Sequence, residues 1–265
     1  DLHPEAHSFP TRRSSDLVQD EKQLSDILLA SLLKEGIDHQ SLAKVARQIL
    51  LRNASINRLV ALARDNDETS LFSELDRCET LAVLSERLFL AVLQTITLPD
   101  VDFERFLTKL RRYLLDVALR ADIHDHWCVQ NPSLICALAR QCFLNGYVFE
   151  ETSEDVSLFD RLISEMASEH LEANPRDRFR IAVVACYVRL ADWDRSAEIL
   201  ELTRAEAEEH YLGLLTQQIE EPLLELRLRN QIPVFGETLD DISTKVQAQY
   251  EEHPYPRWTS VNTLQ

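Results

Sequence analysis

Glycine is scarce in this sequence, with 4 residues among 265, whereas an average protein contains about 7%. Glycine supplies the unusual backbone conformations of tight turns and phosphate-binding loops. The glycines are too far apart to form a G-x-G motif: Gly36, Gly146, Gly213 and Gly236. A nucleotide-binding enzyme is therefore hard to build from these residues, and we expect no cofactor-binding residues in the chain as it stands.

Long apolar runs and a secretion signal are also missing. No run approaches the roughly 18 apolar residues that a membrane-spanning helix needs. The first residues do not join a charged stretch to an apolar one, as a signal peptide does. We therefore expect a cytoplasmic protein without a membrane partner.

The cysteines do not suggest a disulfide framework. They are odd in number and scattered, mostly within apolar helical patterns: Cys78, Cys128, Cys136, Cys142 and Cys186. This pattern predicts reduced, buried thiols.

Positive charge is outnumbered, with 28 Lys and Arg against 45 Asp and Glu and a formal net charge of -17. Most of such a surface would repel a phosphate backbone, so we expect no nucleic-acid partner. Basic residues cluster locally at residues 109–112 (KLRR). They fall on the polar side of an amphipathic pattern, which predicts a solvated helix face.

The pattern that is present is helical almost without interruption from Asp20 onward, and β-type alternation never extends beyond a few residues. Consecutive helices with short loops predict an all-α domain over residues 18–246, built of stacked antiparallel pairs as an irregular α-solenoid or bundle. The first expected helix begins at Asp20, carries Leu24, Ile27, Leu28 and Leu32 on one face and stops at Gly36. Further helices are expected to begin at Asp38, Leu134 and Asn174-Pro175. Others are expected to cover about residues 80–96, 103–117, 156–171, 180–190, 195–202, 205–229 (interrupted at Pro222) and 240–250.

One segment partly fits a tetratricopeptide repeat. The positions that fit are Val183, Val184, Tyr187, Ala191, Trp193, Ser196 and Leu200. No second copy lies at the expected offset of about 34 residues. The solenoid expected here is therefore a degenerate one.

The first residues have an unusual origin. Residues 7–17 (HSFPTRRSSDL) match, residue by residue, one reading frame through a common short-read sequencing adapter. We interpret residues 1–17 as a sequencing artefact and expect them to be disordered. The alternative is a genuine polar N-terminus.

Candidate chemistry is sparse. His124, His126, Cys128 and the nearby Cys136 are metal-ligand residue types, but zinc ligands are usually spaced as C-x2–4-C and H-x3–5-H. A polar loop over residues 124–132 is the favoured interpretation, and we predict no metal ligands. Paired carboxylates at residues 150–151, 154–155 and 251–252 have no partner base in sequence, so we predict surface charge and no catalytic residues.

The C-terminal run at residues 249–258 (QYEEHPYPRW) differs from the rest. Two prolines flank Tyr255 and force an extended backbone directly after a helix. Aromatic side chains so close to a chain end favour docking onto another surface. We expect Tyr255, Arg257 and Trp258 to contact a following domain; the alternative is a tail that folds back on its own helices.

Residues 250–258 (YEEHPYPRW) resemble the linker of bacterial tetratricopeptide-type, S-adenosylmethionine-dependent methyltransferases, with His253 where that family usually has Asn. Residues 137–149 (ALARQCFLNGYVF) resemble a second recurrent segment of the family. The resemblance implies that residues 247–265 lead to a class I methyltransferase domain, which binds S-adenosylmethionine and is missing here. No position of this chain matches a cofactor or catalytic residue of that domain.

Two functions follow as expectations. The first is a helical region that recognises a substrate or partner and covers the methyltransferase domain, and that is non-catalytic when cut off from it. The second is a free-standing helical scaffold that binds a peptide or a partner protein.

Overall fold

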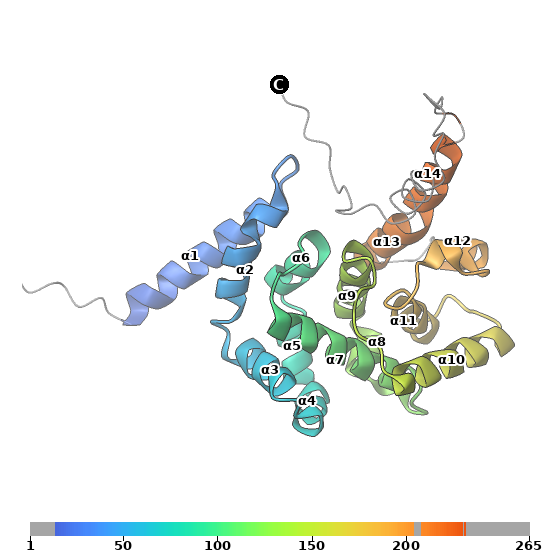
Figure 1. Cartoon of the computed structure of the whole chain (residues 1–265), viewed down its shortest axis with the longest axis horizontal. Helices are drawn as coiled ribbons and strands as arrows, with labels where there is room; N and C mark the ends of the chain where they lie inside the picture. Colours follow the sequence, from blue (N-terminus) through green and yellow to red (C-terminus); the bar gives the residue numbers. More distant parts are fainter. Residues whose placement is uncertain (1–13, 204–207, 230, 232–265) are drawn as a thin grey trace, which may run out of the picture.

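The computed structural model describes residues 14–203, 208–229 and 231. Every regular element in these residues is helical (Figure 1), which confirms the all-α class. The α-helices are α1 (Ser14–Leu32), α2 (Ala43–Leu50), α3 (Ala54–Arg64), α4 (Glu68–Leu75), α5 (Cys78–Leu84), α6 (Arg87–Thr95), α7 (Val101–Ala118), α8 (Trp127–Gln130), α9 (Ser133–Leu144), α10 (Ser153–Ser168), α11 (Pro175–Val184), α12 (Ser196–Thr203), α13 (Glu209–Leu215) and α14 (Glu221–Arg229). Short 3-10 helices are η1 (His39–Leu42), η2 (Ile123–Asp125) and η3 (Leu190–Asp192), and η4 (Thr216–Glu220) is a π-helix.

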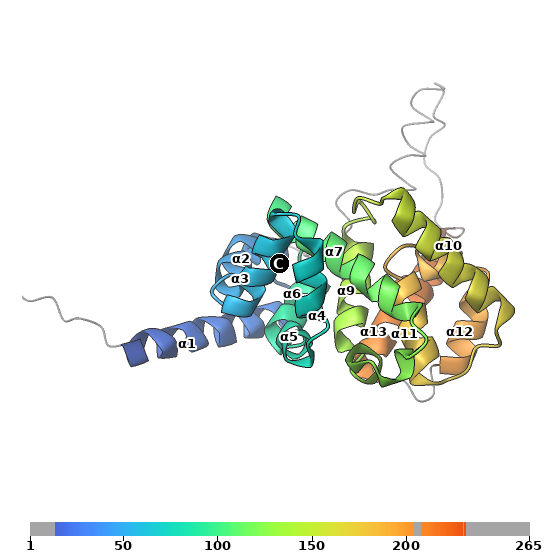
Figure 2. The same cartoon turned by 90° about the horizontal axis from the view of Figure 1, so that it is seen from below.

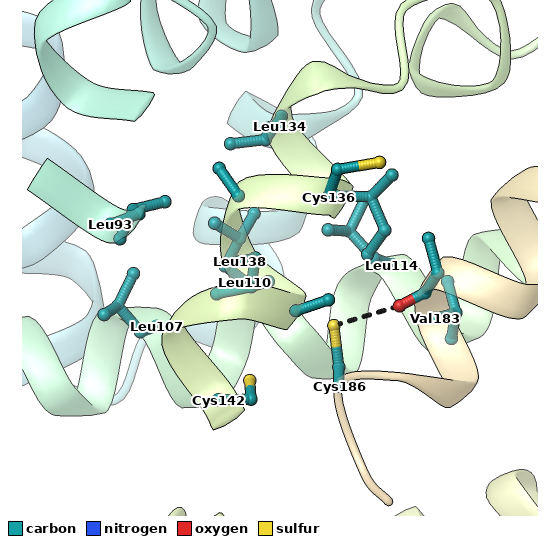
Figure 3. Close-up of a cluster of buried hydrophobic side chains, with 14 of the residues drawn as sticks. Leu93, Leu107, Leu110, Leu114, Leu134, Cys136, Leu138, Cys142, Val183 and Cys186 are labelled. Carbon is teal, nitrogen blue, oxygen red and sulfur yellow. Dashed lines mark hydrogen bonds between the residues drawn. The ribbon is translucent and has the colours of Figure 1, made fainter. Parts of the chain in front are cut away.

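Two helices, α7 and α9, form the centre of the structure. Helix α7 contacts α3, α4, α10 and α11, whereas α9 contacts α6, α11 and α13. Figure 2 places α1–α6 on one side of this pair and α10–α13 on the other. Buried leucines of both helices lie beside one another in Figure 3: Leu107, Leu110 and Leu114 of α7, and Leu134 and Leu138 of α9. The helix expected to begin at Leu134 is α9, which lies at the centre of the core.

The arrangement of the helices around this centre is not a simple sequence of neighbours. The most extensive packing joins α6 with α9 and α3 with α7, pairs that are separated by other helices in the chain. In a regular solenoid each repeat contacts mainly its neighbours. The stacked-pair arrangement and the tetratricopeptide interpretation therefore stay predictions.

The helix expected over residues 80–96 is two helices. The chain leaves the helical conformation at Glu86, whose ψ is 143°. Helix α5 contacts α3, α4 and α8, whereas α6 contacts α1 and α9. Both have buried apolar residues, and one straight helix cannot direct them toward such different partners, so the break at residues 85–86 turns the second half.

Other boundaries also differ from the expectations. Helix α1 begins at Ser14, so residues 14–17 are helical rather than disordered. Leu28 and Leu32 are buried as expected, but Leu24 and Ile27 are 44% and 64% exposed. The expected loop over residues 124–132 contains η2 and α8, and α11 already ends at Val184 rather than continuing toward residue 190.

Helix starts follow the local capping chemistry. Asn174 accepts a hydrogen bond from the backbone N–H of Asp177 and Pro175 begins α11, so this predicted start is confirmed. Thr152 and Asp155 form a reciprocal capping box at α10. Asp38 stands at the N-cap of η1, but its side chain makes no capping bond.

A single buried glutamine connects several elements near the C-terminal end. Gln218, on η4, is completely buried. Its Nε2 donates to the carbonyls of Ala139 (2.9 Å) and Ala185 (3.0 Å). Its Oε1 accepts from the Tyr147 hydroxyl (3.2 Å) and the Leu190 N–H (3.3 Å). The hydrogen bonds of this one side-chain amide therefore join η4 to α9, to the residue after α11 and to η3.

We predict that Gln218→Leu lowers the free energy of unfolding by about 2 kcal/mol or more, because the buried Ala185 carbonyl and Leu190 N–H lose this partner and each costs about 1–3 kcal/mol when left unpaired. Denaturant unfolding followed by circular dichroism measures this change.

The matched control is Gln217→Leu, the same substitution one residue earlier in η4, where the amide oxygen has no hydrogen-bond partner. Its effect should stay below about 1 kcal/mol. Equal losses in both variants would show that the Gln218 amide does not stabilise the fold.

Candidate interaction surfaces

His126 is used to hold helices together. Its Nδ1 accepts the backbone N–H of Cys128 (3.2 Å) and caps α8, and its Nε2 lies 3.2 Å from the hydroxyl of Tyr113 on α7. Because Nδ1 is an acceptor, the neutral ring carries its proton on Nε2 and donates to Tyr113. The Tyr113 hydroxyl in turn lies 3.0 Å from the Leu75 carbonyl and 2.9 Å from Asp76 Oδ1.

The other residues of the metal hypothesis do not gather around His126. His124 is exposed, and Cys128 and Cys136 are buried thiols whose pKa burial raises to about 12. Within the described ranges, no three His, Cys, Asp or Glu side chains are placed to hold a metal ion. Cys142 and Cys186 are buried and free as predicted, but Cys78 is exposed.

Burial lowers the pKa of His126, and the nearby Arg120 guanidinium lowers it further, while Asp76 and Asp122 act in the opposite direction. Burial also raises the pKa of Tyr113 far above its usual range. Near neutral pH both groups are therefore uncharged in the folded chain. They act as a hydrogen-bonded connection between α4, α7 and α8.

This lowered pKa predicts a pH effect on stability. The unfolded chain takes up a proton on His126 more readily than the folded one, so its contribution to stability is present above the ordinary pKa of 6.5 and is lost as pH falls through that value. In His126→Asn, the asparagine side chain can still cap α8, but it does not titrate. We expect the free energy of unfolding of the original chain to fall more steeply than that of the variant between about pH 7 and pH 5.

Denaturant unfolding at a series of pH values makes this comparison. His124→Asn, at an exposed histidine two positions away, is the control and should keep the original slope. Parallel curves for all three proteins would contradict the assignment to His126.

The buried position of Arg111 contradicts the solvated helix face that was expected at residues 109–112. Its side chain is only 2% exposed, with the guanidinium carbon 4.3 Å from the ring centre of Tyr187 and 5.2 Å from that of Phe149. Its amino groups donate to the carbonyl of Glu150 (3.1 Å) and the carboxylate of Glu151 (3.3 Å). The prediction was wrong because α10, α11 and the segment before α10 cover this side of α7.

Of the carboxylates predicted to be surface charge, Glu150, Glu151 and Glu154 are exposed, whereas Asp155 is buried. Asp155 is 5% exposed and accepts a hydrogen bond from Arg112 at 2.7 Å. Glu154 also pairs with Arg112, at 2.9 Å. The third carboxylate pair, residues 251–252, lies outside the described residues.

A second buried arginine ties α11 to α10. Arg180 is 1% exposed, and it pairs with Glu169 at 2.7 Å and Glu165 at 3.2 Å. Sequence reasoning missed Arg111 and Arg180. The available signal lies on the C-terminal side of each arginine, where residues 113–115 (YLL) and 181–184 (IAVV) are apolar. A charge at the edge of such a run has to find a partner if the helix is enclosed.

An open cavity with a volume of about 500 Å³ lies between α3 and α7. Arg64, Arg105 and Lys109 line it together with Glu104 and Glu150, so charges of both signs border a partly apolar floor. Lys109 is held by the Asn66 side chain at 2.6 Å. A cavity of about 290 Å³ between α1, α3 and α6 is similarly mixed, with Lys22, Arg52 and Glu86 beside apolar residues.

Exposed leucines mark α14, the last described helix. Leu224, Leu226 and Leu228 are 48%, 54% and 47% exposed. Pro222 is buried and Leu223 packs against the core, so the helix is attached at its first turn. Figure 1 shows the rest of α14 extending away from α13 and the body. Among the described helices, none combines the length and apolar character that crossing a bilayer requires.

The predicted interdomain residues Tyr255, Arg257 and Trp258 lie outside the described residues, as does the helix expected over residues 240–250. Comparison with known proteins gave no match: no family model, no curated protein and no solved structure aligns significantly with the chain. Its function therefore has to be argued from its own residues.

Proposed function

We propose that this chain is the helical region of a bacterial S-adenosylmethionine-dependent methyltransferase, where it recognises a substrate or partner and covers the catalytic domain. The observation that carries the proposal is the segment YEEHPYPRW at residues 250–258, which resembles the linker before such a domain.

The catalytic step itself is assigned to the following domain. Methyl transfer needs the sulfonium of the cofactor to be held in line with a nucleophile. Gly36 and Gly146 have positive φ and stand after the ends of α1 and α9. A phosphate- or cofactor-binding glycine loop instead precedes a helix, so that the N–H groups of the first turn point at the ligand. We therefore assign no contact with S-adenosylmethionine to these residues.

The helical region would contribute binding and enclosure. A rigid helical surface can position a substrate or partner at low entropic cost, and a cover over the reaction centre excludes water. Both roles require a firm attachment between the helices and the catalytic domain, which the proposal assigns to Tyr255, Arg257 and Trp258.

A second candidate is a free-standing scaffold that binds a peptide or partner protein. The open cavity of about 500 Å³ between α3 and α7 favours it, since charges of both signs beside the apolar Ala63 and Val101 suit a mixed peptide. Peptides selected from a random display library on the chain should then lose binding in Arg105→Glu. Selection of peptides that bind this variant equally well would count against the cavity.

The methyltransferase proposal predicts that the reading frame continues past Gln265 into a strand followed by a G-x-G-x-G loop. The longer protein should bind S-adenosylmethionine in isothermal titration calorimetry, and the chain ending at Gln265 should not. Sequencing the intact gene through both ends provides the first test. A stop codon directly after Gln265 would overturn the proposal and favour the scaffold.

A further inference from the structure

The exposed part of α14 combines leucines with charged residues, a composition suited to contact with another segment. At 100° per residue, Leu224 and Leu228 lie on one side of the helix, whereas Leu226 lies on the opposite side. Glu221 and Glu225 occupy the first half of α14, and Arg227 and Arg229 occupy its last turn. Helix α14 therefore presents a short leucine face between an acidic start and a basic end.

A complementary pattern follows nine residues later in the same chain. Leu239, Ile242, Val246 and Tyr250 are spaced by three and four residues, so a helix over residues 239–250 would carry them on one face. Asp240 and Asp241 stand at the start of this segment. Nine residues, 230–238, separate this segment from α14 in sequence, which is close to the length usual between neighbouring antiparallel helices.

We propose that residues 239–250 dock as a helix, antiparallel to α14, on the face formed by Leu224 and Leu228. In this orientation Asp240 and Asp241 lie beside Arg227 and Arg229. A parallel orientation would instead bring these aspartates to the acidic first half of α14, and like charges side by side are unfavourable.

Contact area decides between this segment and a second copy of the chain. Helix α14 has 9 residues, which span about 13 Å, while a stable interface between copies buries about 800 Å² on each partner. Two leucines and their flanks fall well short of that area. A segment tethered through residues 230–238 needs far less, because the tether holds it at an effective concentration in the mM range.

The docking has a consequence for the end of the chain. Twelve helical residues span about 18 Å, longer than α14, so Tyr250 would reach back beside η4. Residues 251–258 would then leave from the side of the molecule where Gln218 joins η4 to α9. The inference does not depend on a methyltransferase domain.

Disulfide trapping in the full chain tests the proposal. In a Cys78→Ser background, which removes the exposed thiol, one variant carries Leu224→Cys with Ile242→Cys and the matched control carries Leu226→Cys with Ile242→Cys. The docked arrangement predicts at least about tenfold faster oxidation of the first pair, measured by intact mass. An untethered segment would oxidise both pairs at similar rates, which would overturn the proposal.

Hydrogen exchange provides a second readout that needs no new cysteine. Exchange in residues 239–250 should be at least about tenfold faster in Leu224→Ser/Leu228→Ser than in the original chain, and unchanged in Leu226→Ser. Equal exchange in all three would contradict the docking, as would a dimer, in light scattering, that only the double variant abolishes. A stop codon after Gln265 would overturn the proposed function but leave these expectations intact.

Discussion

The enclosure of α7 is the constraint on which the rest of the structure depends. Helix α7 is packed by α3 and α4 on one side and by α10 and α11 on the other, with α9 crossing it. Glu104 and Arg105 near the start of α7 stay exposed, but the polar side chains of its enclosed part must find partners inside the protein. Arg111 meets aromatic rings and backbone carbonyls, and Tyr113 meets His126 and Asp76. These partners belong to segments that are distant in sequence, and their contacts with α7 fix where those segments lie.

The spacing of apolar residues was enough to predict the helices that are buried on one face or on all sides, because that spacing alone defines such helices. The helix predicted over residues 103–117 is α7, and the predicted start at Asn174-Pro175 is that of α11. Periodicity could not locate the break at Glu86, since both halves of that run are apolar. Their divergence is decided by tertiary partners, α9 for one half and α3 and α4 for the other.

The partners of the polar side chains at the candidate surfaces were harder to predict from sequence, because they too depend on which helices pack together. Arg111 and Arg112 are adjacent and chemically alike, yet one is buried against rings and the other pairs with Asp155 at the edge of α10. They differ because Arg111 meets residues before α10 and after α11, whereas Arg112 meets the first turn of α10. Gln218 follows Gln217 directly, yet the Gln218 amide is fully hydrogen-bonded, whereas the buried amide oxygen of Gln217 has no hydrogen-bond partner. Sequence reasoning identified the aromatic segment at residues 250–258 as the outstanding feature, and its docking remains a prediction.

Pro222 connects these observations at the C-terminal end. Proline in a continuous α-helix clashes with the carbonyl four residues earlier, which here belongs to Gln218. The wider π-turn of η4 contains that residue and ends directly before α14. One extra residue in a turn rotates everything that follows by about 100°. The same π-turn that accommodates Pro222 therefore accompanies the inward position of Gln218 and sets the direction of α14, in which Leu224, Leu226 and Leu228 are all exposed beyond the first turn.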